Sequence, residues 1–186
     1  MLKKCNSICS WVLTFCLIGH LLTMSYSMLT GWYDYTICKM LARSTAAVTA
    51  LHVLISLIIV FFFHDGAQIG KYAGQNIRTI LQRASGLVII CLLHMHVKAF
   101  GFIVTGAVLS TLQKLSLLGT ELLFFAAIFT HLGASFSRSL ITMGWLTSDE
   151  TEHKIDRGIA ILCVVLMLLT AFALTRYTIL WSGYGG

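Results

Sequence analysis

Five long apolar segments alternate with short polar ones along the chain of 186 residues, and this pattern predicts five helices. A membrane-spanning helix needs about 20 mostly apolar residues, and a charge near the middle of the bilayer is expensive. Stretches poor in charged residues therefore mark the predicted spans, which cover residues 8–30, 43–64, 80–104, 115–142 and 156–180. We expect an all-α membrane protein that forms one integral membrane domain over residues 1–186, with five transmembrane helices.

Composition and charge support this prediction. Hydrophobic residues make up 58% of the chain and charged residues 11%, whereas about a quarter of the residues of a soluble domain are charged. The net charge of +6 comes from basic residues scattered among apolar runs, so nucleic acid is not expected as a partner. A cytoplasmic N-terminus puts eight of the 13 Lys and Arg residues on the cytoplasmic side and five outside, which favours that orientation.

The first apolar segment also resembles a signal peptide, because Lys3 and Lys4 precede it. It is longer than a typical signal-peptide core and no small-residue cleavage site follows, so we expect it to be retained as the first span. The six cysteines form neither CxxC nor CxxCH, so covalent haem attachment is not expected. Motifs typical of hydrolases and nucleotide-binding proteins are also missing from the sequence.

Histidines are the most informative polar residues, because each of the first four predicted spans carries one or two of them. Those away from the ends of the spans are His20, His52, His131 and, in the third span, His94 and His96. One intramembrane histidine can simply bond a neighbouring helix, but buried imidazoles in four successive helices are costly without partners. Haem iron is a partner that would satisfy them in pairs. The first four helices are therefore expected to form a bundle that binds two haem b groups.

The depth of each histidine predicts how the ligands pair. His52 and His131 each lie about 16 Å from the cytoplasmic ends of their spans, at the helical rise per residue. His20 lies about 18 Å and His96 about 24 Å from such an end, so these two form an outer pair. His94 and His96 point about 200° apart, so only one of them faces a given haem. Two histidine ligands leave no vacant iron position, so such a haem carries electrons.

Polar residues near these histidines are candidates for contacts to haem and quinone. Ser135 and Arg138 share the His131 face, and Arg138 either meets a haem propionate or anchors the helix at the membrane surface. Quinone chemistry needs an acid or a phenol to exchange protons.

The candidate quinone residues near the outer end are Tyr33, Asp34, Glu121 and His94. Glu121 is the strongest, since an intramembrane carboxylate indicates a functional site, although pairing with Lys114 is an alternative. For Tyr33 and Asp34, an ordinary interfacial role is the simpler interpretation.

The third span contains the sequence LQRASG at residues 81–86, with His96 thirteen residues after Arg83. This segment resembles the third helix of the di-haem cytochrome b membrane anchor of succinate dehydrogenase and fumarate reductase. The resemblance selects His96 over His94 as a ligand, and Arg83 and Ser85 become candidate contacts to a haem propionate or face. Residues 130–133 with 141–145, and residues 17–21, are similar to the fourth and first helices of that family, and the second helix matches only in His52.

The resemblance implies a subunit that performs no succinate or fumarate chemistry itself. It would anchor a flavoprotein and an iron-sulfur subunit at the cytoplasmic face of a bacterial inner membrane. Electrons would pass between those respiratory subunits and menaquinone or ubiquinone in the surrounding lipid. In the family the second and fourth helices hold the inner haem and the first and third the outer one. Phe129 stands where some members carry a proton-conducting Glu, so that route is not expected here.

Two other functions are compatible with the same pattern. One is a di-haem cytochrome b that serves another dehydrogenase, such as a hydrogenase or a formate dehydrogenase. The other is a haem-free small transporter or scaffold whose histidines line a proton path. A reduced-minus-oxidised optical spectrum distinguishes them, because only a cytochrome b shows the bands of b-type haem.

Overall fold

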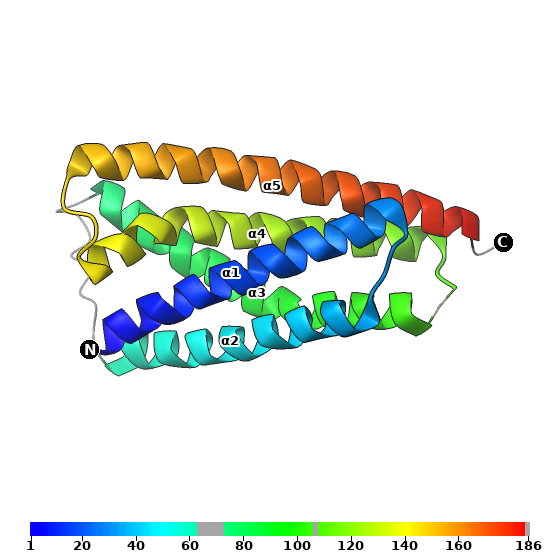
Figure 1. The fold of residues 1–186 in the computed structure, drawn as a ribbon, viewed down its shortest axis with the longest axis horizontal. Coiled ribbons are helices and arrows are strands. Elements are labelled where there is room, and N and C mark those ends of the chain that lie inside the picture. Colours follow the sequence, from blue (N-terminus) through cyan, green and yellow to red (C-terminus); the bar gives the residue numbers. More distant parts are fainter. Residues whose placement is uncertain (63–72, 106–107, 185–186) are drawn as a thin grey trace. The chain divides into compact units, whose positions relative to one another are not determined.

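The computed structural model of the chain describes residues 1–62, 73–105 and 108–184. This part of the chain contains five helices and no strand (Figure 1). The helices are α1 (Leu2–Thr30), α2 (Tyr35–Phe62), α3 (Ala73–Thr105), α4 (Thr111–Met143) and α5 (Asp149–Tyr184). Each is long and apolar enough to cross a membrane, so the prediction of five transmembrane helices is confirmed at this level.

The helices begin before the predicted spans do. α1 starts at Leu2 and α2 at Tyr35, although the charge-poor stretches suggested residues 8 and 43. Lys39, which precedes the predicted second span, therefore lies on α2. Charge-free sequence marks the hydrocarbon core, whereas a helix continues through the polar interface because its backbone groups remain paired there. The predicted end of the second span, at residues 63 and 64, lies outside the described residues.

A short connection joins α1 to α2. α1 ends at Thr30 and is capped by Gly31, whose φ of 76° lets its N–H donate to the Ser27 carbonyl at 2.9 Å. The Asp34 carboxylate then accepts the Ile37 N–H at 2.9 Å and caps the start of α2. Only residues 31–34 separate the helices, so α1 and α2 form an antiparallel hairpin.

The chain divides into two compact units. The first comprises Met1–Asn76 with Phe136–Asp156, and it contains the hairpin of α1 and α2. The second comprises Ile77–Ser135 with Arg157–Gly186, and it contains most of α3, α4 and α5.

Polar contacts fix the register of the α1–α2 hairpin. The Ser56 hydroxyl donates to Asn6 Oδ1 at 3.3 Å, and the Cys9 thiol lies 3.7 Å from the Val48 carbonyl oxygen. Residues later in α1 contact residues earlier in α2, as antiparallel packing requires. Small side chains at such contacts allow two helices to approach closely in a membrane.

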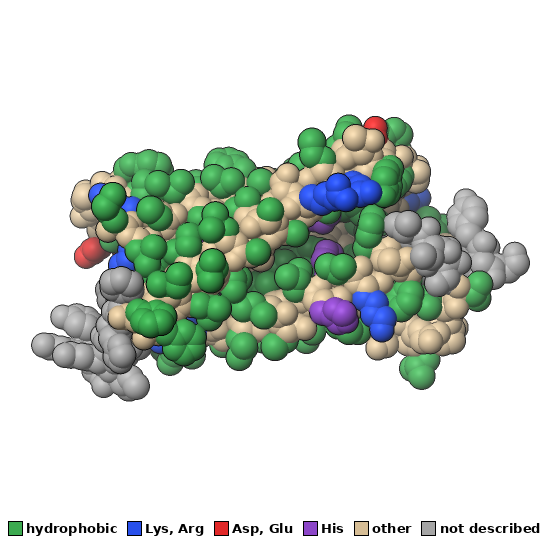
Figure 2. Space-filling model, turned by 90° about the horizontal axis from the view of Figure 1, so that it is seen from below, with side chains coloured by type: hydrophobic (Ala, Val, Ile, Leu, Met, Phe, Trp, Pro, Cys, Tyr) green, Lys and Arg blue, Asp and Glu red, His purple; other side chains and the backbone are tan. Residues whose placement is uncertain are grey.

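Large apolar side chains lie exposed on every helix, among them Phe15, Leu54, Leu87, Leu123 and Leu168. Hydrophobic side chains cover much of the face in Figure 2, and charged ones are few there. An apolar surface of this extent is unfavourable in water and favourable in lipid. The exposed residues thus agree with membrane-spanning helices.

Candidate functional site

The His131 ring packs against the LQRASG segment of α3. Its Nδ1 lies 2.9 Å from the Gln82 carbonyl oxygen and 3.3 Å from the Ser85 hydroxyl. Gly86 leaves space for the ring, because a Cβ at this position would lie 3.4 Å from two ring atoms. A carbonyl oxygen can only accept a hydrogen bond, so the Gln82 contact favours the tautomer with the proton on Nδ1. The lone pair that binds a metal is then on Nε2.

The His96 ring makes an equivalent contact to a carboxylate. Its Nδ1 lies 2.7 Å from Oε2 of Glu121, whose side chain is 7% exposed. The Phe124 ring stacks on the imidazole with centroids 4.7 Å apart and planes inclined by 23°. The carboxylate acceptor again favours the proton on Nδ1, and the lone pair on Nε2.

These contacts set the register of α3 and α4, and they place the two histidines at different levels. His131 is level with Ser85, while His96 is level with Glu121, so α3 and α4 run antiparallel. Eleven residues of α3 separate the two levels, which corresponds to about 17 Å of helical rise.

The α1–α2 hairpin separates its own two histidines in the same way. His52 lies midway between Val48 and Ser56, whose partners on α1 are Cys9 and Asn6. His20 lies about twelve residues further along α1, which corresponds to about 19 Å of rise. Within each pair of antiparallel helices, α1 with α2 and α3 with α4, the two histidines therefore lie at different levels.

The structure distinguishes His94 from His96. His96 is half-buried against α4, whereas His94 is exposed on α3. The choice of His96 as the haem ligand of the pair stays a prediction.

If the chain binds the two haems that its histidines predict, His94→Leu should retain both. His96 lies on the side of α3 that contacts α4, whereas the His94 side chain is exposed. The optical difference spectrum of the purified variant checks this. Loss of one haem on this change alone would show that the wrong member of the pair was selected.

The remaining candidate haem contacts are spread along α3 and α4. Ser85 is buried beside His131, while Arg83 is exposed. The Ser135 hydroxyl donates to the His131 carbonyl oxygen at 2.7 Å, which ties it to the backbone. Arg138 is partly exposed, two turns after His131 on the same helix.

Substitution at Gly86 tests the packing of His131. The branched side chain in Gly86→Val would occupy the space of the ring and displace it from the Gln82 carbonyl. We expect this variant to lose most of the haem that depends on His131, and Gly86→Ala to lose less. Haem content per chain is the measurement. The control is Gly101→Val, also in α3, where a Cβ would meet no atom within 4 Å; an equal loss in the control would point to a general helix defect.

The candidate quinone residues lie in both units. Tyr33 and Asp34 belong to the first unit, and His94 and Glu121 to the second. Partial burial raises the pKa of the Tyr33 phenol, and the nearby Cys38 and Tyr35 side chains raise it further. Asp34 has a structural role as the cap of α2.

Two substitutions separate the capping role of Asp34 from proton exchange. Asp34→Ala removes the cap and is expected to cost about 1 kcal/mol of stability, whereas Asp34→Asn keeps an acceptor for the Ile37 N–H. Thermal unfolding in detergent should show a lower midpoint for the Ala variant only. Lower quinone reduction in the Asn variant at unchanged stability would instead indicate a proton-exchanging role.

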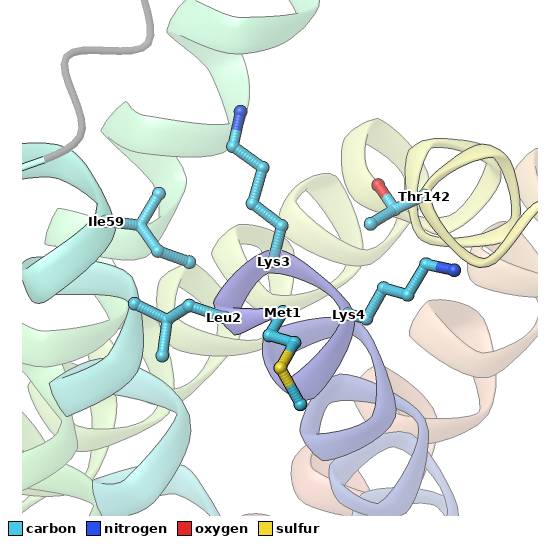
Figure 3. A pocket seen from close by; sticks show the side chains of 6 residues that line it. All are labelled: Met1, Leu2, Lys3, Lys4, Ile59 and Thr142. Atoms are coloured by element: carbon cyan, nitrogen blue, oxygen red, sulfur yellow. The ribbon is translucent and has the colours of Figure 1, made fainter.

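A cavity of about 420 Å³ opens at the N-terminal end of α1 (Figure 3). Its lining consists of Met1, Leu2, Lys3, Lys4, Ile59 and Thr142, and it includes neither a histidine nor a carboxylate. The two lysine side chains leave α1 in different directions (Figure 3). Ile59 lies two helical turns beyond His52, so the cavity is at the end of the hairpin that we expect to face the cytoplasm.

Haem is the group that the sequence predicts for these histidines. Within the described residues, no three or more His, Cys, Asp and Glu side chains gather where they could hold an ion. Two histidine side chains would hold each haem. His96 and His131 would each supply one side chain, to different haems, since the contact at Nδ1 leaves the ring lone pair on Nε2.

Comparisons with protein-family models, with curated proteins and with solved structures found no match to this chain. The resemblance to the succinate dehydrogenase anchor thus depends on the residues quoted above. Sequence reasoning overlooked the Gln82 carbonyl, because a backbone acceptor has no signature in the sequence. It also overlooked the contact between His96 and Glu121, although both residues lie about equally far from the α3–α4 connection.

Proposed function

We propose that this chain is the membrane anchor and electron-transfer subunit of a succinate dehydrogenase or fumarate reductase complex. Two haem b groups would carry electrons between the iron-sulfur subunit and quinone. The observation that supports this best is the spacing of the histidines. Within each pair of antiparallel helices the two histidines lie at different levels, which are separated by about 17 Å in one pair and about 19 Å in the other.

The proposed ligand pairs follow from depth. His52 and His131 would hold the inner haem, since they lie ten and twelve residues before the ends of α2 and α4, respectively. His20 and His96 would hold the outer haem. Each haem then takes one ligand from each hairpin.

The chain would perform three tasks in electron transfer. Its histidine pairs would hold two haems, each of which would supply a one-electron ferric/ferrous couple. The Gln82 carbonyl and the Glu121 carboxylate hold the His131 and His96 rings in the tautomer that presents Nε2. The buried Phe124 ring covers one face of the His96 ring.

The proposed partners are distributed by side of the membrane. A flavoprotein and an iron-sulfur subunit would dock at the cytoplasmic face of a bacterial inner membrane, where the cavity beside Lys3 and Lys4 opens. Menaquinone or ubiquinone would exchange electrons near the outer haem. A di-haem cytochrome b of another dehydrogenase would have the same ligand arrangement.

A second candidate function is proton movement without haem. The buried contact of His96 with Glu121 favours it, because a carboxylate and an imidazole within hydrogen-bond distance can relay a proton. The chain would then be a small transporter or scaffold.

Copurification tests the proposed function. The tagged chain, expressed in its native host, should retain a flavoprotein and an iron-sulfur protein, and succinate should reduce its haem. Haem that is reduced by hydrogen or formate and not by succinate would assign the chain to another dehydrogenase. A colourless preparation would favour the haem-free alternative.

A further inference from the structure

Glu121 is a buried carboxyl group with one oxygen bonded to His96 and the other without a bond among the described residues. Its Oε2 lies 2.7 Å from His96 Nδ1, while Oε1 is buried and has no hydrogen-bond partner among the described residues. A buried carboxylate is costly unless a donor compensates it. The His96 N–H is the donor that the structure supplies.

We propose that Glu121 is a positioning residue for the haem that His96 ligates. The proposal rests on the proposed function and assigns Glu121 a role other than the quinone contact suggested by its sequence. Its carboxylate would fix the tautomer of His96 and make the imidazole a more basic iron ligand.

The surroundings of the ring support a fixed orientation. Phe124 stacks on one face of His96, and the Phe125 ring lies edge-on with centroids 5.9 Å apart and planes at 89°. Together with the Glu121 contact, these rings restrict rotation of the imidazole about its side-chain bonds. The Nε2 lone pair is then held in one direction.

The carboxylate acceptor has an electronic consequence. Hydrogen bonding to a negative oxygen increases the electron density on the imidazole, which stabilises ferric relative to ferrous iron. Glu121 should therefore lower the reduction potential of this haem. His131 donates to the neutral Gln82 carbonyl, so the effect of Glu121 is confined to one of the two haems.

The test is a potentiometric titration of Glu121→Gln in the purified complex. The amide oxygen still accepts from His96, so both haems should remain while the negative charge is lost. We expect the reduction equilibrium constant of one haem to rise at least tenfold, which is about 59 mV for one electron. The affected haem is identified as the one that is lost in His96→Leu.

Matched variants make the result specific. Glu150→Gln makes the same chemical change at an exposed position on α5 and should leave both potentials unchanged. If Glu121→Gln does not assemble, Glu121→Asp and Glu121→Asn provide a second pair of equal size, in which Asn should have the higher potential.

Two results would overturn the proposal. One is Glu121→Gln with both haems present and both potentials unchanged. The other is equal potentials in the Asp and Asn variants. Failure of the proposed function looks different, because the wild-type chain would then contain no haem, or haem that succinate does not reduce.

Discussion

Replacement of His131 by leucine is expected to remove one haem and to leave the other. The iron of that haem would lose an axial ligand, and leucine cannot restore it or the bond to the Gln82 carbonyl. His52→Leu is expected to remove the same haem, because the two residues are proposed to share one iron. Optical difference spectra and haem content per chain measure the loss, and low-temperature spectra identify which haem remains.

The comparison of the two variants tests the inner pair directly. A double variant, His52→Leu with His131→Leu, should lose no more haem than either single variant. Loss of different haems in the two single variants would refute this pairing, and retention of both haems in either would remove that residue from the ligand set.

The second large effect is expected at the outer pair. His96→Leu and His20→Leu should each remove the haem that survives in His131→Leu. Leucine at position 96 also leaves Glu121 buried without its donor, so this variant should be less stable than His20→Leu. Haem content and thermal unfolding in detergent measure the two effects separately.

Combining the pairs provides a further check on the ligand assignment. His96→Leu with His131→Leu should contain no haem, since each iron loses one axial ligand. One retained haem in this double variant would mean that another side chain, such as His94, serves as a ligand.

Sequence reasoning predicted the helices well, because a membrane span must be long and apolar whatever its tertiary contacts. The helix ends were less predictable. α2 begins at Tyr35 because Asp34 caps it, and the cap has no relation to the hydrophobicity that defined residues 43–64. The first two turns of α2, which carry Lys39, were missed for the same reason.

The candidate site was predictable in residue type and less so in contacts. His20, His52, His96 and His131 stand out in the sequence because imidazoles are rare and costly in apolar helices.

The hydrogen-bond partners of these histidines depend on the register between adjacent helices. The distribution of charged residues along the chain does not reveal that register. Glu121 illustrates this, since its distance from His96 follows from the α3–α4 register and not from either helix alone. Similarly, the contact of Ser85 and Gly86 with His131 depends on packing between helices.

The most direct test of the whole account is the haem content of the purified wild-type chain. A pyridine haemochrome assay combined with quantitative amino-acid analysis should give two b-type haems per chain, and low-temperature spectroscopy should show both irons as low-spin with two histidine ligands. A chain that contains no haem, or only one, when purified from cells that produce haem in excess would contradict it.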